Sequence, residues 1–109
     1  EGISKTYTYQ NGLLHGDFIV YADNGKIIEK GKYLDGQKHG KWTTWNNGGK
    51  KTAEIFFAHG LKEGKWQIWD DNGTLRYLMF YQAGQKVGTW QVFNSDGSLA
   101  EQKDYTQLM

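Results

Sequence analysis

Glycines recur every 24 residues along this chain without any change in spacing, at Gly16, Gly40, Gly64 and Gly88. A fixed period of this length is typical of a repeat protein, in which each unit packs mainly against its neighbours. The 109 residues therefore predict one repeat domain without a large central core. Its expected units are a partial one at 1–15, complete ones at 16–39, 40–63 and 64–87, and an incomplete last one at 88–109.

Large aromatic residues occupy three fixed positions in these units, and we interpret them as structural aromatics. The first two lie two and five residues after each glycine, at Phe18, Trp42, Trp66 and Trp90 and at Tyr21, Trp45, Trp69 and Phe93. The third lies twelve residues after the second, at Tyr33, Phe57, Tyr81 and Tyr105, with Tyr9 as the counterpart one unit earlier. The first two aromatics are three residues apart, so they should face opposite sides of a strand unless a bulge intervenes, and both faces should carry aromatic rows.

Two kinds of turn alternate along the chain. Asp23-Asn24-Gly25-Lys26 and its copies place a glycine where a short hairpin loop needs a left-handed residue. The return connection, Asp35-Gly36-Gln37-Lys38-His39-Gly40, has two glycines four residues apart, which predicts a longer turn with two unusual backbone positions. The expected fold is all-β, a single meandering antiparallel sheet of about nine strands from Ile3 to Tyr105, with no helix. Successive copies of one position should lie two strands apart, about 9.6 Å, so the intervening aromatic must fill the gap.

Composition excludes several classes of function. The net charge is only +1, which gives no reason to expect nucleic acid as a partner, and no apolar run is long enough for a transmembrane segment. The chain has no cysteine, and His15 and His39 share a repeat position with Glu63 at a separation too large for one metal ion. Serine lacks any nucleophile motif. We therefore predict no enzyme activity, no catalytic residues, no cofactor and no metal.

The pattern in Gly40-Lys41-Trp42-Thr43-Thr44-Trp45, Gly49 and Phe57-Ala58-His59-Gly60-Leu61-Lys62-Glu63-Gly64 resembles the bacterial variant of the MORN repeat. The resemblance extends over about four units, nearly the whole chain, but Leu108 stands where glycine is expected. It implies an elongated array of β-hairpins without catalytic residues. It also implies an exported or lipid-anchored bacterial protein, in some cases with an antitoxin label of the YwqK type.

Two kinds of surface are candidates for binding. Five lysines on two repeat positions predict a basic docking strip along the return-turn edge, made of Lys38, Lys41, Lys62, Lys65 and Lys86. The alternative interpretation is that these lysines only keep the edge soluble. An open meander also has two edge strands that could pair with another chain, and we place these at Tyr7 and Tyr9 and at Tyr105.

The leading functional hypothesis is a non-catalytic scaffold or accessory subunit of an exported bacterial assembly, with another protein bound at an edge strand or an aromatic face. A second hypothesis is a module that binds anionic lipid or glycan, and a third is an antitoxin-like protein that caps a toxin. We expect export to the periplasm, the outer membrane or the cell surface, with the cytoplasm as the alternative.

Overall fold

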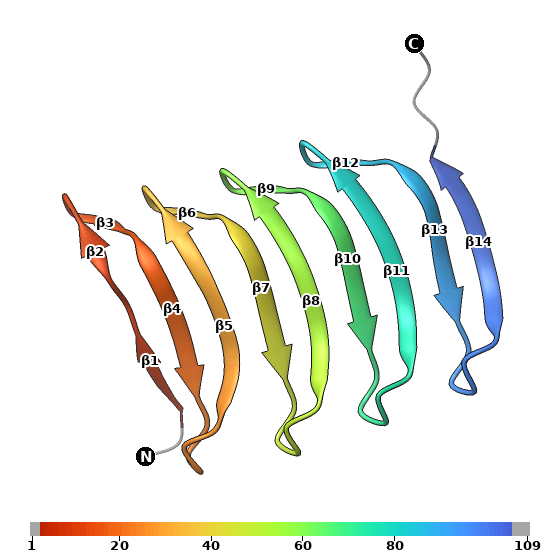
Figure 1. The fold of residues 1–109 in the computed structure, drawn as a ribbon, viewed down its shortest axis with the longest axis horizontal. Helices are drawn as coiled ribbons and strands as arrows, with labels where there is room; N and C mark the ends of the chain where they lie inside the picture. The colour runs from red at the N-terminus through yellow and green to blue at the C-terminus, as the bar shows by residue number, and fades with distance from the viewer. Residues whose placement is uncertain (1–2, 106–109) are drawn as a thin grey trace.

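The fold is one curved antiparallel sheet, drawn in Figure 1. The computed structural model describes residues 3–105, which contain no helix and so none that could cross a membrane. Dimensions of 40 × 38 × 13 Å correspond to a single layer. The main path has nine strands, β1 (Ser4–Thr6), β4 (Gly16–Tyr21), β5 (Ile27–Leu34), β7 (Gly40–Trp45), β8 (Lys51–Ala58), β10 (Gly64–Trp69), β11 (Leu75–Gln82), β13 (Gly88–Phe93) and β14 (Leu99–Tyr105). The predicted all-β meander is confirmed.

Short strands extend the sheet at the return connections. They are β6 (Gln37–Lys38), β9 (Leu61–Lys62) and β12 (Gln85–Lys86), and the equivalent β2 (Tyr9–Gln10) and β3 (Leu13–Leu14) form a separate pair. The two residues at each tip have positive φ, 50° at Asp35 and 83° at Gly36, as a type I′ turn requires. Gly40 has φ 82°, so this connection has three left-handed residues. The glycine pattern did not predict the one at Asp35, which is not a glycine.

The opposite turns are closed by the predicted glycines. Gly25 has φ 84°, its N–H donates to the carbonyl of Ala22, and the N–H of Ala22 donates to the carbonyl of Lys26. In each hairpin the register shifts by one residue beside this turn, as between Thr44 and Trp45. The second strand therefore contains a β-bulge next to every such turn.

One face of the sheet carries a continuous row of rings, which we call the aromatic row. Neighbouring ring centroids along it are 5.0–6.4 Å apart, so rings of adjacent strands alternate as predicted. Its members are Tyr7, Phe18, Tyr33, Trp42, Phe57, Trp66, Tyr81, Trp90 and Tyr105. The indole Nε1 of Trp66 donates to the carbonyl of Phe56 at 2.9 Å, and Trp42 and Trp90 repeat this bond ten residues from their acceptors. The bond explains why tryptophan suits this repeat position.

Burial is concentrated at Trp42, whose side chain is only 2% exposed. Phe18 and Val20 complete the small buried cluster. Gly31 makes this burial possible, since a Cβ built there would lie 2.0 Å from Cδ2 of Trp42. The equivalent positions in later units hold Ile55, Met79 and Lys103, so the close approach of the indole to the backbone is confined to this unit.

The second face carries the other aromatics, as predicted from their spacing, since Trp45 lies opposite the side of Trp42. The prediction that they also form a row of rings on this face is wrong. Tyr21, Trp45, Trp69 and Phe93 are paired across the hairpins with Ile27, Lys51, Leu75 and Leu99. Within residues 3–105 these four aromatics make no ring contact with one another. Aliphatic and basic side chains separate them, because the bulge changes which residue of the second strand faces this side.

Successive units are linked at the return turns by repeated backbone bonds. The N–H of Gly36 donates to the carbonyl of Leu14, Gly60 to Lys38 and Gly84 to Lys62, at 2.8–2.9 Å. Side chains add a second link, because His39 Nδ1 accepts from the N–H of His59, and Glu63 Oε1 accepts from the N–H of Ala83. These contacts fix one turn upon the next along the whole edge.

The two edges of the sheet differ from the predicted ones at the N-terminal end. The edge strand there is β1, whereas Tyr7 lies outside any strand and Tyr9 belongs to β2, which pairs only with β3. Within residues 3–105 no further unit lies on the outer side of β1 and β2. The chain there is interrupted between these two strands and pairs on one side only. Tyr105 ends β14, which is the opposite edge, as expected.

Candidate functional site

A basic cleft opens on the face opposite the aromatic row, which we call the cleft face. Alternation along β7 points Trp42 to one side and its neighbours Lys41 and Thr43 to the other. The cleft has a volume of about 660 Å³ and extends across β4, β5, β7 and β8. Its lining includes the charged and aromatic side chains of Asp17, Lys30, Lys32, Lys41, Lys51 and Trp45.

The register explains how these side chains meet. Lys30 and Lys32 flank Gly31 on β5 and so share one face, while Asp17 pairs with Lys32 across the hairpin. Lys30 pairs with Thr43 of β7 in the next unit. Two units therefore contribute to the cleft, and neither could form it alone.

The four lysines differ in whether a carboxylate neutralises them. Glu54 Oε2 lies 2.9 Å from Lys51 Nζ and 3.9 Å from Lys41 Nζ. The hydrogen bond from Lys51, together with the positive charge of both lysines, lowers the pKa of Glu54. Within residues 3–105 no carboxylate lies within 4.0 Å of the ammonium groups of Lys30 and Lys32. The arrangement can therefore bind an anionic group through these two lysines, with Trp45 as an adjoining flat surface.

The docking strip predicted from the sequence is not one strip. Lys38, Lys62 and Lys86 lie on the aromatic row, with Lys38 Nζ 4.7 Å from the centroid of Trp42 and Lys86 Nζ 5.0 Å from that of Trp90. Lys41 and Lys65 lie on the cleft face, because each directly precedes a tryptophan of the row in its strand. A spacing of three residues, with a left-handed glycine between, separates the two sets.

Ring contacts occupy the lysines of the aromatic row. Lys62 Nζ lies 5.1 Å from the Trp66 centroid and 4.9 Å from that of Tyr81. Cation–π attraction at such exposed positions contributes about 0.5–1 kcal/mol. A ligand that bound these ammonium groups would have to compete with the rings, whereas Lys30 and Lys32 have no such ring contact within residues 3–105.

The histidines belong to the stacked return turns. His39 and His59 are 4.9 Å apart between ring centroids, and His15 Nδ1 lies 3.9 Å from a carboxylate oxygen of Asp35. Within residues 3–105 no group of three histidine, cysteine or acidic side chains could hold a metal ion.

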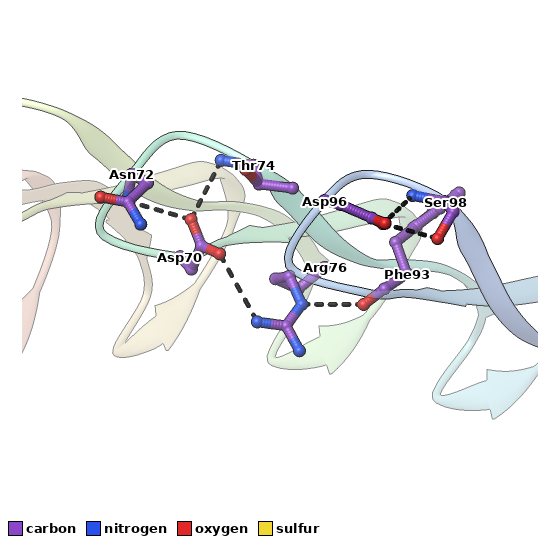
Figure 2. A network of polar contacts seen from close by, with 7 residues as sticks. All are labelled: Asp70, Asn72, Thr74, Arg76, Phe93, Asp96 and Ser98. Atoms are coloured by element: carbon purple, nitrogen blue, oxygen red, sulfur yellow. Dashed lines mark hydrogen bonds and ion pairs between the residues drawn. The ribbon is translucent and has the colours of Figure 1, made fainter.

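The turns at the other end of the strands contain a polar network, shown in Figure 2. Asp70 Oδ1 accepts hydrogen bonds from the N–H groups of Asn72 and Thr74, each at 3.0 Å. Arg76 joins this turn to the next unit, because its Nε donates to the carbonyl of Phe93 at 2.8 Å and its Nη1 lies 3.5 Å from Asp70 Oδ2. Asp70 therefore stabilises its own turn through its side chain.

This network predicts an acid-sensitive turn. Hydrogen bonds from the backbone of Thr74 and Asn72, together with Arg76, lower the pKa of Asp70. Its stabilising contribution is complete above the unfolded pKa of about 3.9 and is lost as the pH falls through the lower folded pKa. Below about pH 4, we expect the melting temperature of the Asp70→Asn variant to fall less steeply than that of the parent chain. Equal slopes in the two chains would contradict this assignment.

Comparison with known proteins agrees with the repeat geometry. The family model of the MORN repeat variant matches residues 14–35, 62–83 and 86–107, which is more than half of the chain. This chain belongs to the MORN repeat variant family. The unit between the first two matches has the same strands and the same aromatic positions. MORN repeats are non-catalytic modules that generally bind proteins or lipids.

Other comparisons add little to this assignment. A search of curated proteins gives no match. Eight chains of solved structures match, among them a crystal structure of a Bacteroides fragilis protein with unknown function. That protein is 15% identical, with 96% of this chain and 93% of the other covered and a TM-score of 0.31.

One part of the sequence could have predicted the basic cleft, although it does not follow the repeat pattern. Lys30-Gly31-Lys32 alternates on a strand, so both ammonium groups must lie on one face. Neither lysine has a lysine counterpart in the following units, where the equivalent residues are Glu54, Phe56, Leu78 and Phe80. Because these lysines do not recur at the repeat period, the repeat pattern gives no indication of them.

Proposed function

We propose that this MORN array is a non-catalytic scaffold that binds an acidic segment of another protein in the basic cleft. The observation that carries the proposal is the concentration of four lysines and one aspartate around a single cleft, on a chain whose net charge is only +1. Positive charge gathered in this way attracts acidic partners and orients them. A toxin would be one such partner if the antitoxin-like role implied by the family resemblance applies.

The cleft supports this function better than the aromatic face does. Rings of the aromatic row already contact one another on both sides, and its lysines lie over those rings. On the cleft face, no carboxylate within residues 3–105 lies within 4.0 Å of the ammonium groups of Lys30 and Lys32, and Trp45 is only partly buried. A partner that reached the cleft would gain new ion pairs instead of replacing existing contacts.

An anionic lipid or glycan is the second candidate, favoured by the same unneutralised lysines. The ammonium groups of Lys30 and Lys32 would serve phosphate, sulfate or carboxylate groups equally well. Export in a bacterium remains part of the proposal and is supported by the family resemblance. Fractionation of the native source, followed by detection of the chain in each fraction, tests the location.

Charge reversal on the two faces should distinguish the sites. We expect Lys30→Glu/Lys32→Glu to reduce recovery of a crosslinked partner from the native source about tenfold or more, because two ion pairs become repulsive. The matched variant Lys62→Glu/Lys86→Glu makes the same charge change on the aromatic face and should retain the partner. Recovery is measured by crosslinking and quantitative mass spectrometry.

Two other results would contradict the proposed protein-binding cleft. Loss of the partner only in the Lys62→Glu/Lys86→Glu variant would move the site to the aromatic face. Recovery of no protein, together with binding to vesicles of anionic phospholipid that depends on Lys30 and Lys32, would replace the protein partner by lipid.

A further inference from the structure

β14 is the last strand of the sheet that residues 3–105 form, and its outer side is an edge of that sheet. Within residues 3–105 this strand pairs only with β13, and Leu99 to Asp104 are all exposed. Neither proline nor a bulge interrupts the segment from Glu101 to Asp104. An edge of this kind presents free backbone donors and acceptors to any second strand.

The repeat geometry identifies which residues direct their backbone outward. In β11 the carbonyl of Phe80 accepts the N–H of Val87, so alternate residues of that strand, Leu78 and Phe80, bond toward the following strand. The residues of β14 one period later are Gln102 and Asp104. Their N–H and C=O groups therefore point to the open edge.

We propose that β14 pairs antiparallel with β14 of a second copy of this chain, about a two-fold axis at Gln102. Each Gln102 then forms a hydrogen-bonded pair with Gln102 of the second copy. Glu101 faces Lys103 of the second copy, and Lys103 faces Glu101. Ala100 and Asp104 also face each other, so this register places no like charges opposite each other between Ala100 and Asp104.

The charges select this register among the neighbouring ones. An axis at Glu101 would place the two Glu101 carboxylates opposite each other, and an axis at Lys103 would do the same with two ammonium groups. Parallel pairing in register would oppose both pairs of like charges. Like charges directly opposite across strands destabilise the pairing, whereas opposite charges stabilise it.

The side chains are free to make these contacts. Glu101 and Lys103 pair across the hairpin with Val92 and Trp90, and both lie on the aromatic face. Lys103 Nζ lies 5.1 Å from the Tyr105 ring, an exposed contact that it can exchange for a carboxylate. A two-fold axis normal to the sheet keeps both aromatic faces on the same side, so pairing extends one sheet across both copies.

The test uses charge reversal and mixing, measured by size-exclusion chromatography with light scattering. We expect the parent chain to dimerise and Glu101→Lys and Lys103→Glu alone to weaken self-association about tenfold each, because each places like charges opposite one another. An equimolar mixture of the two single variants should recover the dimer, since lysines at 101 and 103 then face glutamates. The double variant Glu101→Lys/Lys103→Glu should dimerise by itself.

Matched controls make the same charge changes at an exposed turn. Asp23→Lys and Lys26→Glu should leave the dimer intact, and mixing them should change nothing. A parent chain that stays monomeric at every concentration would overturn the proposal. Single variants that dimerise like the parent chain would overturn it equally.

A crosslink provides a second readout that does not depend on charge. The chain has no cysteine, and Cα atoms of a hydrogen-bonded pair are about 5.5 Å apart, within the range for a disulfide. Oxidised Gln102→Cys should form a covalent dimer much faster than the turn variant Ser95→Cys. Equal rates would contradict the axis at Gln102. The pairing uses a different surface from the basic cleft and is measured on the purified chain alone, so either proposal can fail without the other.

Discussion

Replacing Trp42 by alanine is expected to lower the free energy of unfolding by about 3–5 kcal/mol, measured by urea denaturation. The indole is 2% exposed and contacts the rings of Phe18, Tyr33 and Phe57. Its Nε1 also donates to the carbonyl of Lys32 at 3.2 Å. The substitution removes the largest buried group of a thin sheet that has little other core, so partial collapse cannot refill the space.

Trp90 provides the matched control for this prediction. It makes the same indole hydrogen bond and packs between the rings of Tyr81 and Tyr105, but its side chain is only partly buried. Trp90→Ala should therefore cost clearly less than Trp42→Ala. Equal losses at the two positions would mean that the row and its hydrogen bond, and not burial, determine the contribution of each tryptophan.

Replacing Gly31 by isoleucine is expected to destabilise the chain by about 1–3 kcal/mol or more, although isoleucine occupies the equivalent position 55 and favours strands. A Cβ at position 31 would lie 2.0–2.4 Å from three ring atoms of Trp42. The indole must then leave its place against Phe18 and Tyr33, and its hydrogen bond to the carbonyl of Lys32 is lost with it.

A double-mutant cycle tests whether this clash is the cause. In a Trp42→Ala background the same Gly31→Ile change should cost much less, because the space above the glycine is empty. The coupling between the two substitutions should exceed about 1 kcal/mol. Strictly additive losses would show that position 31 is sensitive for a reason unrelated to the indole.

The repeat period predicted the strands because each turn depends on a local backbone requirement. Gly25 and Gly36 have the left-handed conformations that hairpin turns need, and those positions recur along the chain. The aromatic row was also predictable, since alternation and strand spacing place rings of neighbouring strands in contact. The close packing of Trp42 over Gly31 was not predictable from the repeat, because later units have Ile55, Met79 and Lys103 at the position of Gly31.

The candidate surfaces were less predictable because they depend on which face each side chain occupies. Gly40, with φ 82°, lies between Lys38 and Lys41 and directs these lysines to opposite faces, which their spacing in the sequence does not indicate. The bulge beside each glycine turn likewise moves Leu75 to the face of Trp69. Lys30 and Lys32 could have been placed by alternation alone, whereas their lack of carboxylate neighbours depends on the register between units.

The stacked return turns make the length of such an array adjustable. Gly60 bonds to Lys38 as Gly84 bonds to Lys62, so removal of one whole period would leave a junction with the same bond already in place. Gain or loss of complete units then changes reach in steps of two strands, about 9.6 Å, while the backbone bonds between return turns stay the same. A partner that contacts both ends of the array at once would therefore fit only an array with a particular number of units.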